Sequence, residues 1–185
     1  MKKSDYKETD LAKILIDMLT DWHWEVYQEV QYGGGRADIV AKRNKILWGI
    51  EVKKTANLHV IEQAYHLKDY CHYASVATPD YHRFFHRLCY QNGIGVLRVH
   101  PHGQSCDEDM RPRLNRKAIG ITLYEEQKTF AEAGSNKGGH WTRFKNTKRN
   151  LIDAVLKTPG IEFNQLIKEI DHHYGSYSVV PFLSY

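Results

Sequence analysis

The chain has 185 residues, of which 42% are hydrophobic and 26% are charged, and its formal net charge at pH 7 is +4. This length fits one medium domain, or one domain with a small module, and the hydrophobic content excludes global disorder. Three cysteines without a CxxC pair exclude a disulfide framework and a structural zinc site, and the lack of a long apolar run or a signal-peptide core favours a cytoplasmic protein.

The first part of the chain shows one helical pattern followed by strand patterns. Residues 5–22 carry apolar side chains at the three-and-four spacing of a helix with one buried stripe. Residues 24–32 alternate as a strand does, and the glycines at 33–35 allow a sharp reversal. A second strand, a tight turn at Asn44-Lys45 and a third strand from Ile46 follow. We therefore expect a helix and then three strands.

The hairpin around Asn44-Lys45 predicts which side chains meet. If the loop has two residues, counting back along both strands places Asp38 opposite Glu51. Arg36 then faces Lys53. Because side chains alternate between the faces of a strand, we expect all four to point to the same side of the sheet.

Two carboxylates at cross-strand distance require a compensating charge. Like charges that face each other in a sheet are destabilising, and each raises the pKa of the other. A divalent cation removes this conflict, and two carboxylate ligands with waters suit Mg²⁺, with Mn²⁺ as a substitute. A lysine beside the bound water, here Lys53, orients it or steadies a developing negative charge. These groups suit phosphodiester hydrolysis, whereas the alternative is an exposed hairpin with solvated charges.

Asp38, with Glu51-Val52-Lys53 on the next strand, resembles the Asp…Glu-x-Lys signature of the PD-(D/E)xK nuclease superfamily. This superfamily includes restriction endonucleases, Holliday-junction resolvases and RecB-like exonucleases. The resemblance covers roughly residues 5–100, and Arg36-Ala37 precede the aspartate in place of proline. It implies a Mg²⁺-dependent endodeoxyribonuclease, in which Asp38, Glu51 and the Val52 carbonyl bind the metal and Lys53 orients the attacking water.

Further site residues follow from the same resemblance. A glutamate on the first helix reaches the metal site in many members, so Glu8 is a candidate ligand; alternatively, it complements the helix dipole. A glutamine after the Glu-x-Lys strand borders the site in several branches, which makes Gln63 a candidate helper; alternatively, it is solvent-exposed. Leu67 stands where RecB-like enzymes have tyrosine. Glu29 is expected to be solvated, with a place in the site as the alternative.

The chain from 57 to 99 continues as alternating helices and strands. Asn57 is expected to cap a helix that ends near residue 70. A strand at 74–79, a helix at 80–92 and a strand at 94–99 follow. The order αβββαβαβ predicts an α/β fold with a mixed sheet between helices, which is the restriction-endonuclease-like core order. The residues of the 80–92 helix that we expect to face inward are Phe84, Phe85, Leu88 and Cys89.

Three regions are expected in the chain as a whole: a nuclease core at 1–100, a connector at 101–139 and a helical module at 140–185. The connector is predicted to be mostly irregular, with a short strand at 119–124 and a helix at 127–133. The module resembles a helix-turn-helix, although an appendage for packing or dimerisation is an equal alternative.

Basic residues in two regions are candidate DNA contacts. Thr147 is expected to cap the first helix of the module, which carries several of them. For the hairpin residues the alternative is solvated charge, and for the residues of the module it is a packing or dimerisation role. The candidate DNA-binding residues are Arg36, Lys54, Arg143, Lys145, Lys148 and Arg149.

Two functions are consistent with these observations. The first is a Mg²⁺-dependent endodeoxyribonuclease with DNA as its partner, which the mild basic excess suits. The second is a non-catalytic DNA-binding or regulatory protein on a nuclease-like fold. The complete Asp, Glu, Lys set favours the enzyme. Site-specific cleavage, resolution of branched DNA and repair stay open, as does a homodimer.

Overall fold

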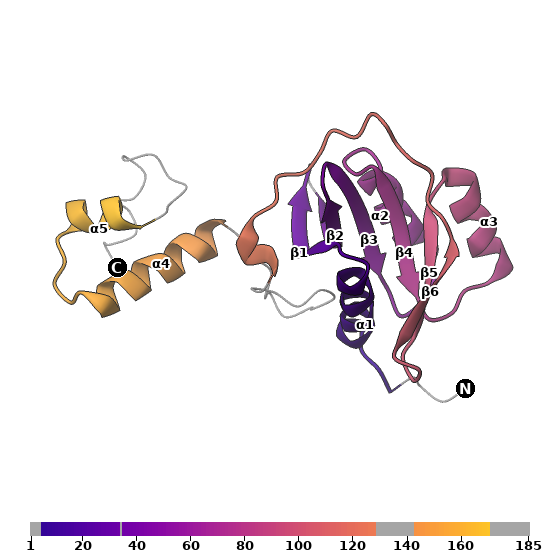
Figure 1. Ribbon diagram of the computed structural model, residues 1–185, viewed down its shortest axis with the longest axis horizontal. Helices are drawn as coiled ribbons and strands as arrows, with labels where there is room; N and C mark the ends of the chain where they lie inside the picture. Colours follow the sequence, from indigo (N-terminus) through magenta and orange to yellow (C-terminus); the bar gives the residue numbers. More distant parts are fainter. Residues whose placement is uncertain (1–4, 34, 129–142, 171–185) are drawn as a thin grey trace. The chain divides into compact units, whose positions relative to one another are not determined.

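The computed structural model describes residues 5–33, 35–128 and 143–170. The chain divides into two compact units, Met1–His140 and Trp141–Tyr185. The first unit is built around a six-stranded sheet (Figure 1), and the second contains two described helices. In chain order the elements are α1 (Glu8–Asp21), β1 (Glu25–Tyr32), β2 (Gly35–Arg43), β3 (Ile46–Val52), α2 (Leu58–Leu67), β4 (Tyr73–Thr78), α3 (Arg83–Asn92), β5 (Gly95–His100), β6 (Ser105–Met110), the 3₁₀ helix η1 (Glu125–Lys128), α4 (Arg143–Lys157) and α5 (Phe163–Glu169).

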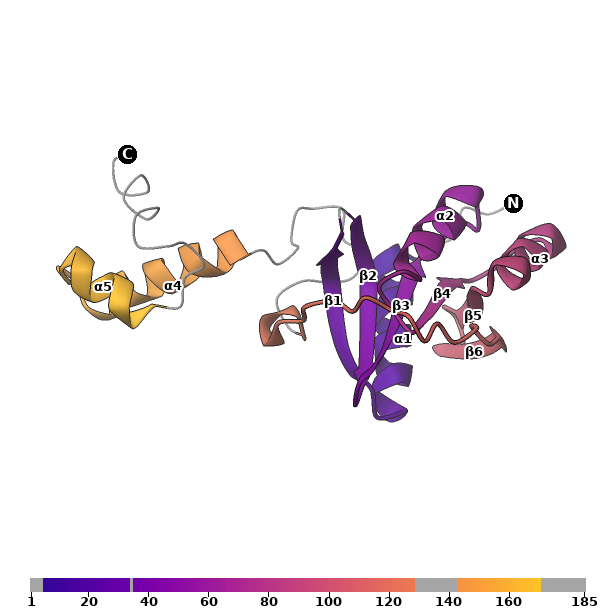
Figure 2. The same ribbon diagram turned by 90° about the horizontal axis from the view of Figure 1, so that it is seen from above.

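The strands lie in the order β1-β2-β3-β4-β5-β6. β1, β2 and β3 are antiparallel, β3, β4 and β5 are parallel, and β6 runs antiparallel to β5. α1 covers one face of the sheet, and α2 and α3 cover the other, as Figure 2 shows from above. The predicted α/β class, with a mixed sheet between helices, is confirmed, and the architecture is consistent with a restriction-endonuclease-like fold.

Apolar side chains pack on both faces of the sheet. On one face, the α1 stripe that includes Leu11 and Leu15 packs against Ile50 and Val52 of β3. On the other face, α2 and α3 pack against β4 and β5. Central strands that are covered on both faces consist almost entirely of apolar residues. A charged residue such as Glu51 within such a strand is therefore exceptional, and it marks the end of β3 as a candidate site.

The β2–β3 hairpin has the predicted register. Arg43 pairs with Ile46, and the ladder continues in the same register toward the start of β2. Asn44 in the two-residue loop has a φ of 56°, in the left-handed region that asparagine tolerates better than most residues. One step beyond the last pair of the ladder, this register places Asp38 across from Glu51.

Two predicted helix ends are also confirmed. The Asn57 side chain accepts a hydrogen bond from the backbone N–H of Val60 at 3.0 Å, and α2 follows directly. Gly93 ends α3 with a φ of 67°, a conformation that glycine adopts without strain from a side chain.

The predicted connector is more ordered than expected, because Ser105–Met110 form β6. An acidic run is a poor strand signal, and this strand forms because β5 offers a free edge and basic partners. Asp109 lies 2.7 Å from Arg98, and Asp107 lies 2.9 Å from His100. The expectation of a mostly irregular segment is therefore wrong here, since pairing with β5 overrides the local composition.

Three smaller expectations differ from the structure. Residues 119–124 form no strand, and of the helix predicted at 127–133 only the beginning, inside η1, lies within the described residues. Phe84 is 66% exposed, whereas Phe85, Leu88 and Cys89 of the same helix face inward as expected. α4 begins at Arg143, so Thr147 is a buried residue inside the helix and does not cap it.

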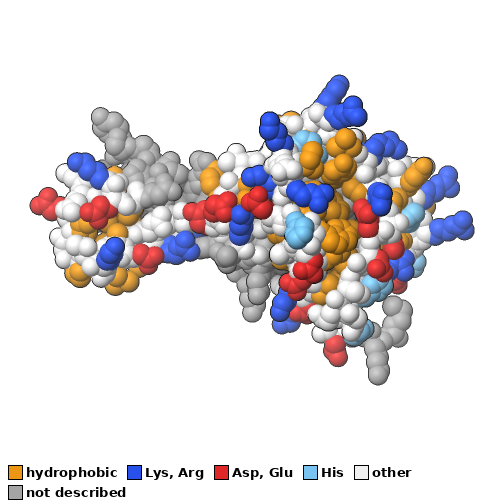
Figure 3. Space-filling model, in the orientation of Figure 1, with side chains coloured by type: hydrophobic (Ala, Val, Ile, Leu, Met, Phe, Trp, Pro, Cys, Tyr) orange, Lys and Arg blue, Asp and Glu red, His pale blue; other side chains and the backbone are white. Residues whose placement is uncertain are grey.

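Charged side chains of both signs are interspersed on the visible surface of the first unit. On the face drawn in Figure 3, hydrophobic side chains gather near the centre of that unit, with lysine and arginine side chains around its rim. None of the described helices is long and apolar enough to cross a membrane.

We expect Gly49→Ala to lower the free energy of unfolding by about 1–3 kcal/mol, because β3 and α2 are in close contact there. A Cβ atom at Gly49 would lie 2.4 Å from Cδ2 of Leu67 and 3.0 Å from Sγ of Cys71. Chemical denaturation measures the change. Gly103→Ala is the control, since its Cβ would meet no described atom closer than 3.5 Å. Equal loss in both variants would contradict the packing of α2 on β3.

Candidate active site

The neighbouring strands β2 and β3 carry two buried carboxylates on the sheet face that α2 covers. The exposed fraction is 6% for Asp38 and 0% for Glu51. Oδ2 of Asp38 accepts a hydrogen bond from the backbone N–H of Val52 at 2.8 Å. This bond holds the Asp38 carboxylate against β3, next to Glu51. Val52 thus contributes its N–H to the site, and a role for its carbonyl stays a prediction.

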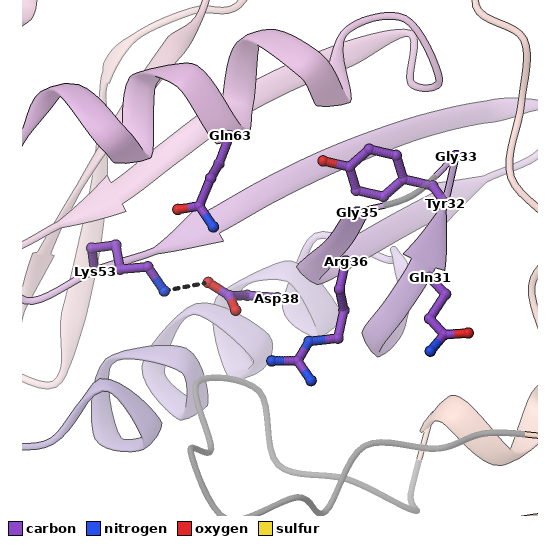
Figure 4. Close-up of a pocket in the computed structure, with 8 residues that line it drawn as sticks. All are labelled: Gln31, Tyr32, Gly33, Gly35, Arg36, Asp38, Lys53 and Gln63. Carbon is purple, nitrogen blue, oxygen red and sulfur yellow. Dashed lines mark ion pairs between the residues drawn. The ribbon is translucent and has the colours of Figure 1, made fainter.

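Lys53 places its ammonium group beside these carboxylates. Its Nζ lies 3.5 Å from Oδ2 of Asp38 and 3.7 Å from Oε2 of Glu8, and Figure 4 shows it directed at Asp38. The backbone N–H of Lys53 donates to the Ala77 carbonyl at 3.0 Å. The pairing of β3 with β4 thus continues one residue past β3 and fixes the start of the lysine side chain.

Glu8 reaches the same place from the first turn of α1. Its Oε1 accepts a hydrogen bond from the backbone N–H of Lys54 at 3.3 Å, and its Oε2 is the atom near the Lys53 ammonium. The Lys54 ammonium lies 5.1 Å from the centre of the Tyr6 ring. Glu8 therefore steadies the segment that carries both lysines. Its role as a metal ligand and the role of Lys54 in DNA binding stay predictions.

Burial opposes the charges of both carboxylates. It raises the pKa of Asp38, and the Lys53 ammonium and the Val52 N–H offset part of that effect. Burial raises the pKa of Glu51 well above its usual range, and the negative charge of Asp38 raises it further. Without another positive charge, the pair therefore tends to hold a proton.

Lys53 responds in the opposite direction. Burial alone would lower its pKa, but the carboxylates of Asp38, Glu8 and Glu51 together raise it above the usual value. The side chain is therefore an ammonium at neutral pH. It can donate hydrogen bonds and stabilise negative charge, and it cannot accept a proton.

Several buried oxygen atoms at the site lack a hydrogen-bond partner among the described residues: both carboxylate oxygens of Glu51 and Oε1 of Gln63. Buried acceptors of this kind are costly, and a hard cation satisfies carboxylate and amide oxygens. Among the described residues, no three or more His, Cys, Asp or Glu side chains form a metal-binding group. Two carboxylates with room for water fit Mg²⁺, which usually keeps several waters in its shell.

A cavity of about 740 Å³ opens beside Asp38, and Glu51 lies buried behind it. Figure 4 shows Gln63 pointing from α2 toward Lys53 and Asp38, so this predicted helper does line the site. The other end of the cavity lies at the glycine-containing turn between β1 and β2. Its wall there includes Tyr32, whose ring lies 4.9 Å from that of Tyr70. The lining residues are Gln31, Tyr32, Gly33, Gly35, Arg36, Asp38, Lys53 and Gln63.

Glu29 was expected to be solvated, and the structure contradicts this: its exposed fraction is 1%. Nε of Arg36 lies 2.8 Å from Oε2 of Glu29. In the β1–β2 ladder, Gln28 pairs with Ile39 in the register that places Glu29 across from Asp38. The signal available in the sequence was this register, but the β1–β2 pairing depends on a turn whose length the glycines leave open.

The predicted DNA contacts of the C-terminal region lie on α4, in the second unit. Lys148 and Arg149 are exposed, Lys145 is half-buried, and a hydrogen bond of 3.2 Å joins Arg149 to Asn146. Arg143 begins the helix, and its side chain lies outside the described residues. No observation joins these residues to the cavity, so their contact with DNA stays a prediction.

No protein-family model matches the sequence, and no curated protein matches it. Among solved structures, the chain is similar to the crystal structure of a repair endonuclease from Pyrococcus abyssi, with 15% identity and a TM-score of 0.45. The similarity covers 55% of this chain and 50% of that chain, so the chain matches about half the length of that protein. A similarity of this size does not assign a function to the chain.

We expect Glu51→Gln to unfold at a higher temperature than the wild type in metal-free buffer at neutral pH. The folded state raises the pKa of Glu51 above the ordinary value of 4.5. The stability linked to this group is therefore fully present below that value and is lost as the pH rises through the folded-state pKa. Each kcal/mol of unfolding free energy that the substitution restores raises Tm by about 2–4 °C for a chain of this size.

Thermal unfolding at several pH values measures this effect. The advantage of Glu51→Gln should shrink as the pH is lowered toward 4.5, where the wild-type group is protonated too. Glu62→Gln is the control, because that glutamate is exposed. A destabilised Glu51→Gln protein at neutral pH, with Glu62→Gln unchanged, would contradict the electrostatic account.

Proposed function

We propose that this chain is a divalent-metal-dependent endodeoxyribonuclease of the PD-(D/E)xK type. The observation that carries the proposal is the pair of buried carboxylates, Asp38 and Glu51, of which Asp38 lines an open cavity. Their pKa values are raised, and no N–H group of the described residues donates a hydrogen bond to either oxygen of Glu51. A fold does not retain such an arrangement for stability, because it is costly without a compensating cation. It is expected at a functional site.

Asp38 and Glu51 are the groups that would hold the cation, with the Val52 carbonyl as a further ligand from the motif resemblance. Mg²⁺ is the proposed metal and Mn²⁺ a substitute, because both accept oxygen ligands with waters. When bound, the cation supplies a Lewis acid for the phosphate and a water of lowered pKa. The Val52 N–H keeps the Asp38 carboxylate in place for this role.

Lys53 supplies the fixed positive charge of the site. Because it stays protonated, it donates a hydrogen bond to the attacking water or to a phosphate oxygen, where negative charge grows during the reaction. Glu8 and Asp38 hold the ammonium from two sides. Gln63 lines the cavity beside it and adds an amide that can orient the water or the phosphate.

DNA is the proposed substrate, on the resemblance of Asp38 and Glu51-Val52-Lys53 to the nuclease signature. The cavity also suits a phosphodiester backbone, because it is open and contains the cationic side chains of Lys53 and Arg36. The homodimer and the cytoplasmic location stay predictions from the sequence.

Cleavage of linear, nicked, single-stranded and four-way DNA tests the proposal. We expect cleavage with Mg²⁺ or Mn²⁺, none in chelator, and little with Ca²⁺, whose looser coordination supports binding but not the reaction. Asp38→Ala and Glu51→Ala should abolish cleavage. Lys53→Ala should slow it about a hundredfold or more, because a donor to the developing charge is lost.

Lys13→Ala is the matched control, because this lysine is exposed on α1. We expect the Lys13→Ala protein to cleave DNA at the wild-type rate. If Lys53→Ala cuts as fast as wild type, the proposed mechanism is wrong. DNA binding without cleavage under any of these conditions would make the non-catalytic DNA-binding protein the better conclusion. Cleavage of RNA by the same residues would change the substrate class.

Metal binding can be measured apart from catalysis. In calorimetric titrations with Mn²⁺ or Ca²⁺, Asp38→Ala and Glu51→Ala should lose the binding heat, while Lys53→Ala should keep it. Affinity should weaken as the pH falls, because protons compete for carboxylates of raised pKa, and binding should release protons. Glu62→Ala should bind as wild type does. Metal binding that survives in Glu51→Ala would place the ion elsewhere.

A further inference from the structure

Arg36 and Glu29 form an ion pair at the cavity that the proposed chemistry does not use. Nε of Arg36 lies 2.8 Å from Oε2 of Glu29. The Arg36 side chain is 40% exposed, while that of Glu29 is 2% exposed. One partner is therefore buried in the sheet, and the other extends from it into the cavity. This asymmetry indicates that Glu29 anchors the guanidinium group.

The backbone at Glu29 supports a specific role. Its φ is 53°, in the left-handed region, although the residue lies inside β1. Non-glycine residues seldom adopt this conformation, and they keep it where the surrounding structure requires it. The neighbouring pairs of the β1–β2 ladder keep their register on both sides of Glu29. The strain is therefore confined to the residue that holds Arg36.

Arg36 has donors left for another partner. Its ion pair uses Nε, and its two terminal nitrogens have no hydrogen bond or ion pair with another described residue. A guanidinium fork with two free terminal nitrogens matches two oxygens of a phosphate group. In Figure 4, Asp38 lies between Lys53 and Arg36, and both cationic side chains line the same cavity.

The arrangement of the strands separates the Arg36 guanidinium from the Lys53 ammonium. The guanidinium's partner Glu29 lies on β1, whereas Lys53 directly follows β3, so the guanidinium and the ammonium lie on opposite sides of Asp38 (Figure 4), about two strand spacings or 10 Å apart. A phosphate at Arg36 is therefore not the one beside Asp38 and Lys53. It is a neighbouring phosphate of the same backbone.

We propose that Arg36 binds the phosphate next to the scissile one, and that Glu29 is the positioning residue that orients its guanidinium. This inference rests on the proposed nuclease function for the identity of the scissile phosphate. The ligand is the phosphodiester backbone itself, so the contact carries no base preference. This contact positions a DNA strand across the cavity before the reaction begins.

The test is DNA binding in Ca²⁺, measured by fluorescence anisotropy over a range of salt concentrations. Arg36→Gln should bind about tenfold or more weakly, because a charge-assisted contact is lost. The slope of log K against log salt should fall by about one unit, as for one phosphate contact. Arg36→Lys keeps the positive charge but loses the two terminal nitrogens of the guanidinium. Its affinity for DNA should therefore lie between those of the wild type and Arg36→Gln.

The DNA affinity of Glu29→Gln distinguishes a positioning role of Glu29 from a simple charge effect, because the two predict changes in opposite directions. The change removes a negative charge near the DNA, so a simple charge effect would tighten binding. A positioning role predicts weaker binding, because the guanidinium is no longer held in place. Glu25→Gln is the matched control: it lies on the same strand and loses its ion pair with Lys128. It should bind as tightly as wild type or more tightly.

Duplexes with a single neutral methylphosphonate at successive positions locate the contact. For wild type, one position beside the cleavage position should cost about tenfold in affinity. For Arg36→Gln, the same substitution should cost nothing further. Thermal unfolding of each variant shows whether it is folded. If Arg36→Gln does not fold, Arg36→Lys replaces it in these measurements.

The two proposals fail in different ways. If the protein cleaves DNA but Arg36→Gln changes neither affinity nor salt slope, or if Glu29→Gln tightens binding, the positioning inference is wrong and the nuclease proposal stands. If no nucleic acid is cleaved but one phosphate position still depends on Arg36, the phosphate contact stands and the nuclease proposal fails.

Discussion

The buried carboxylate pair on the neighbouring strands β2 and β3 is the constraint on which the candidate site depends. Asp38 and Glu51 lie across from each other within a sheet whose faces are covered by helices. Burial and mutual repulsion both act against their charges. Neighbouring groups partly offset this repulsion. The Val52 N–H donates a hydrogen bond to Asp38, and the Lys53 ammonium lies 3.5 Å from the same carboxylate. What is left unsatisfied, at Glu51, is the part of the site that a cation would complete.

Elements far apart in the sequence supply the rest of the site. The first turn of α1 brings Glu8 to the lysines, α2 brings Gln63 over the carboxylates, and β1 brings Glu29 to Arg36. The mixed sheet makes this convergence possible, because the parallel strands β3, β4 and β5 are connected by helices that lie on the face beside the site. Rigid elements hold side chains more closely than loops do.

The fold alone would not distinguish an enzyme from a binding protein, because one architecture can serve many functions. The distinction comes from the charges in the cavity. A protein that merely binds a phosphate backbone benefits from cationic groups such as Lys53 and Arg36. It gains nothing from two buried carboxylates beside them, which repel phosphate unless a cation is present. The carboxylates beside the cationic groups of the cavity therefore support the proposed metal-assisted hydrolysis over binding alone.

The sequence by itself determined the features that depend on neighbouring residues. Strand alternation and a two-residue turn predicted the β2–β3 register, and Asn57 and Gly93 marked helix ends that the structure confirms. Tertiary structure decided the features that depend on distant partners. The acidic segment Ser105–Met110 became a strand because β5 offered it an edge, and Glu29 became buried because the β1–β2 pairing placed it beside Arg36. The resemblance to the nuclease superfamily suggested that Glu8 and Gln63 lie at the site. The packing of α1 and α2 on the sheet decided how close they come to Lys53 and to the cavity. Local rules act over a few residues, whereas burial and edge pairing are properties of the assembled sheet.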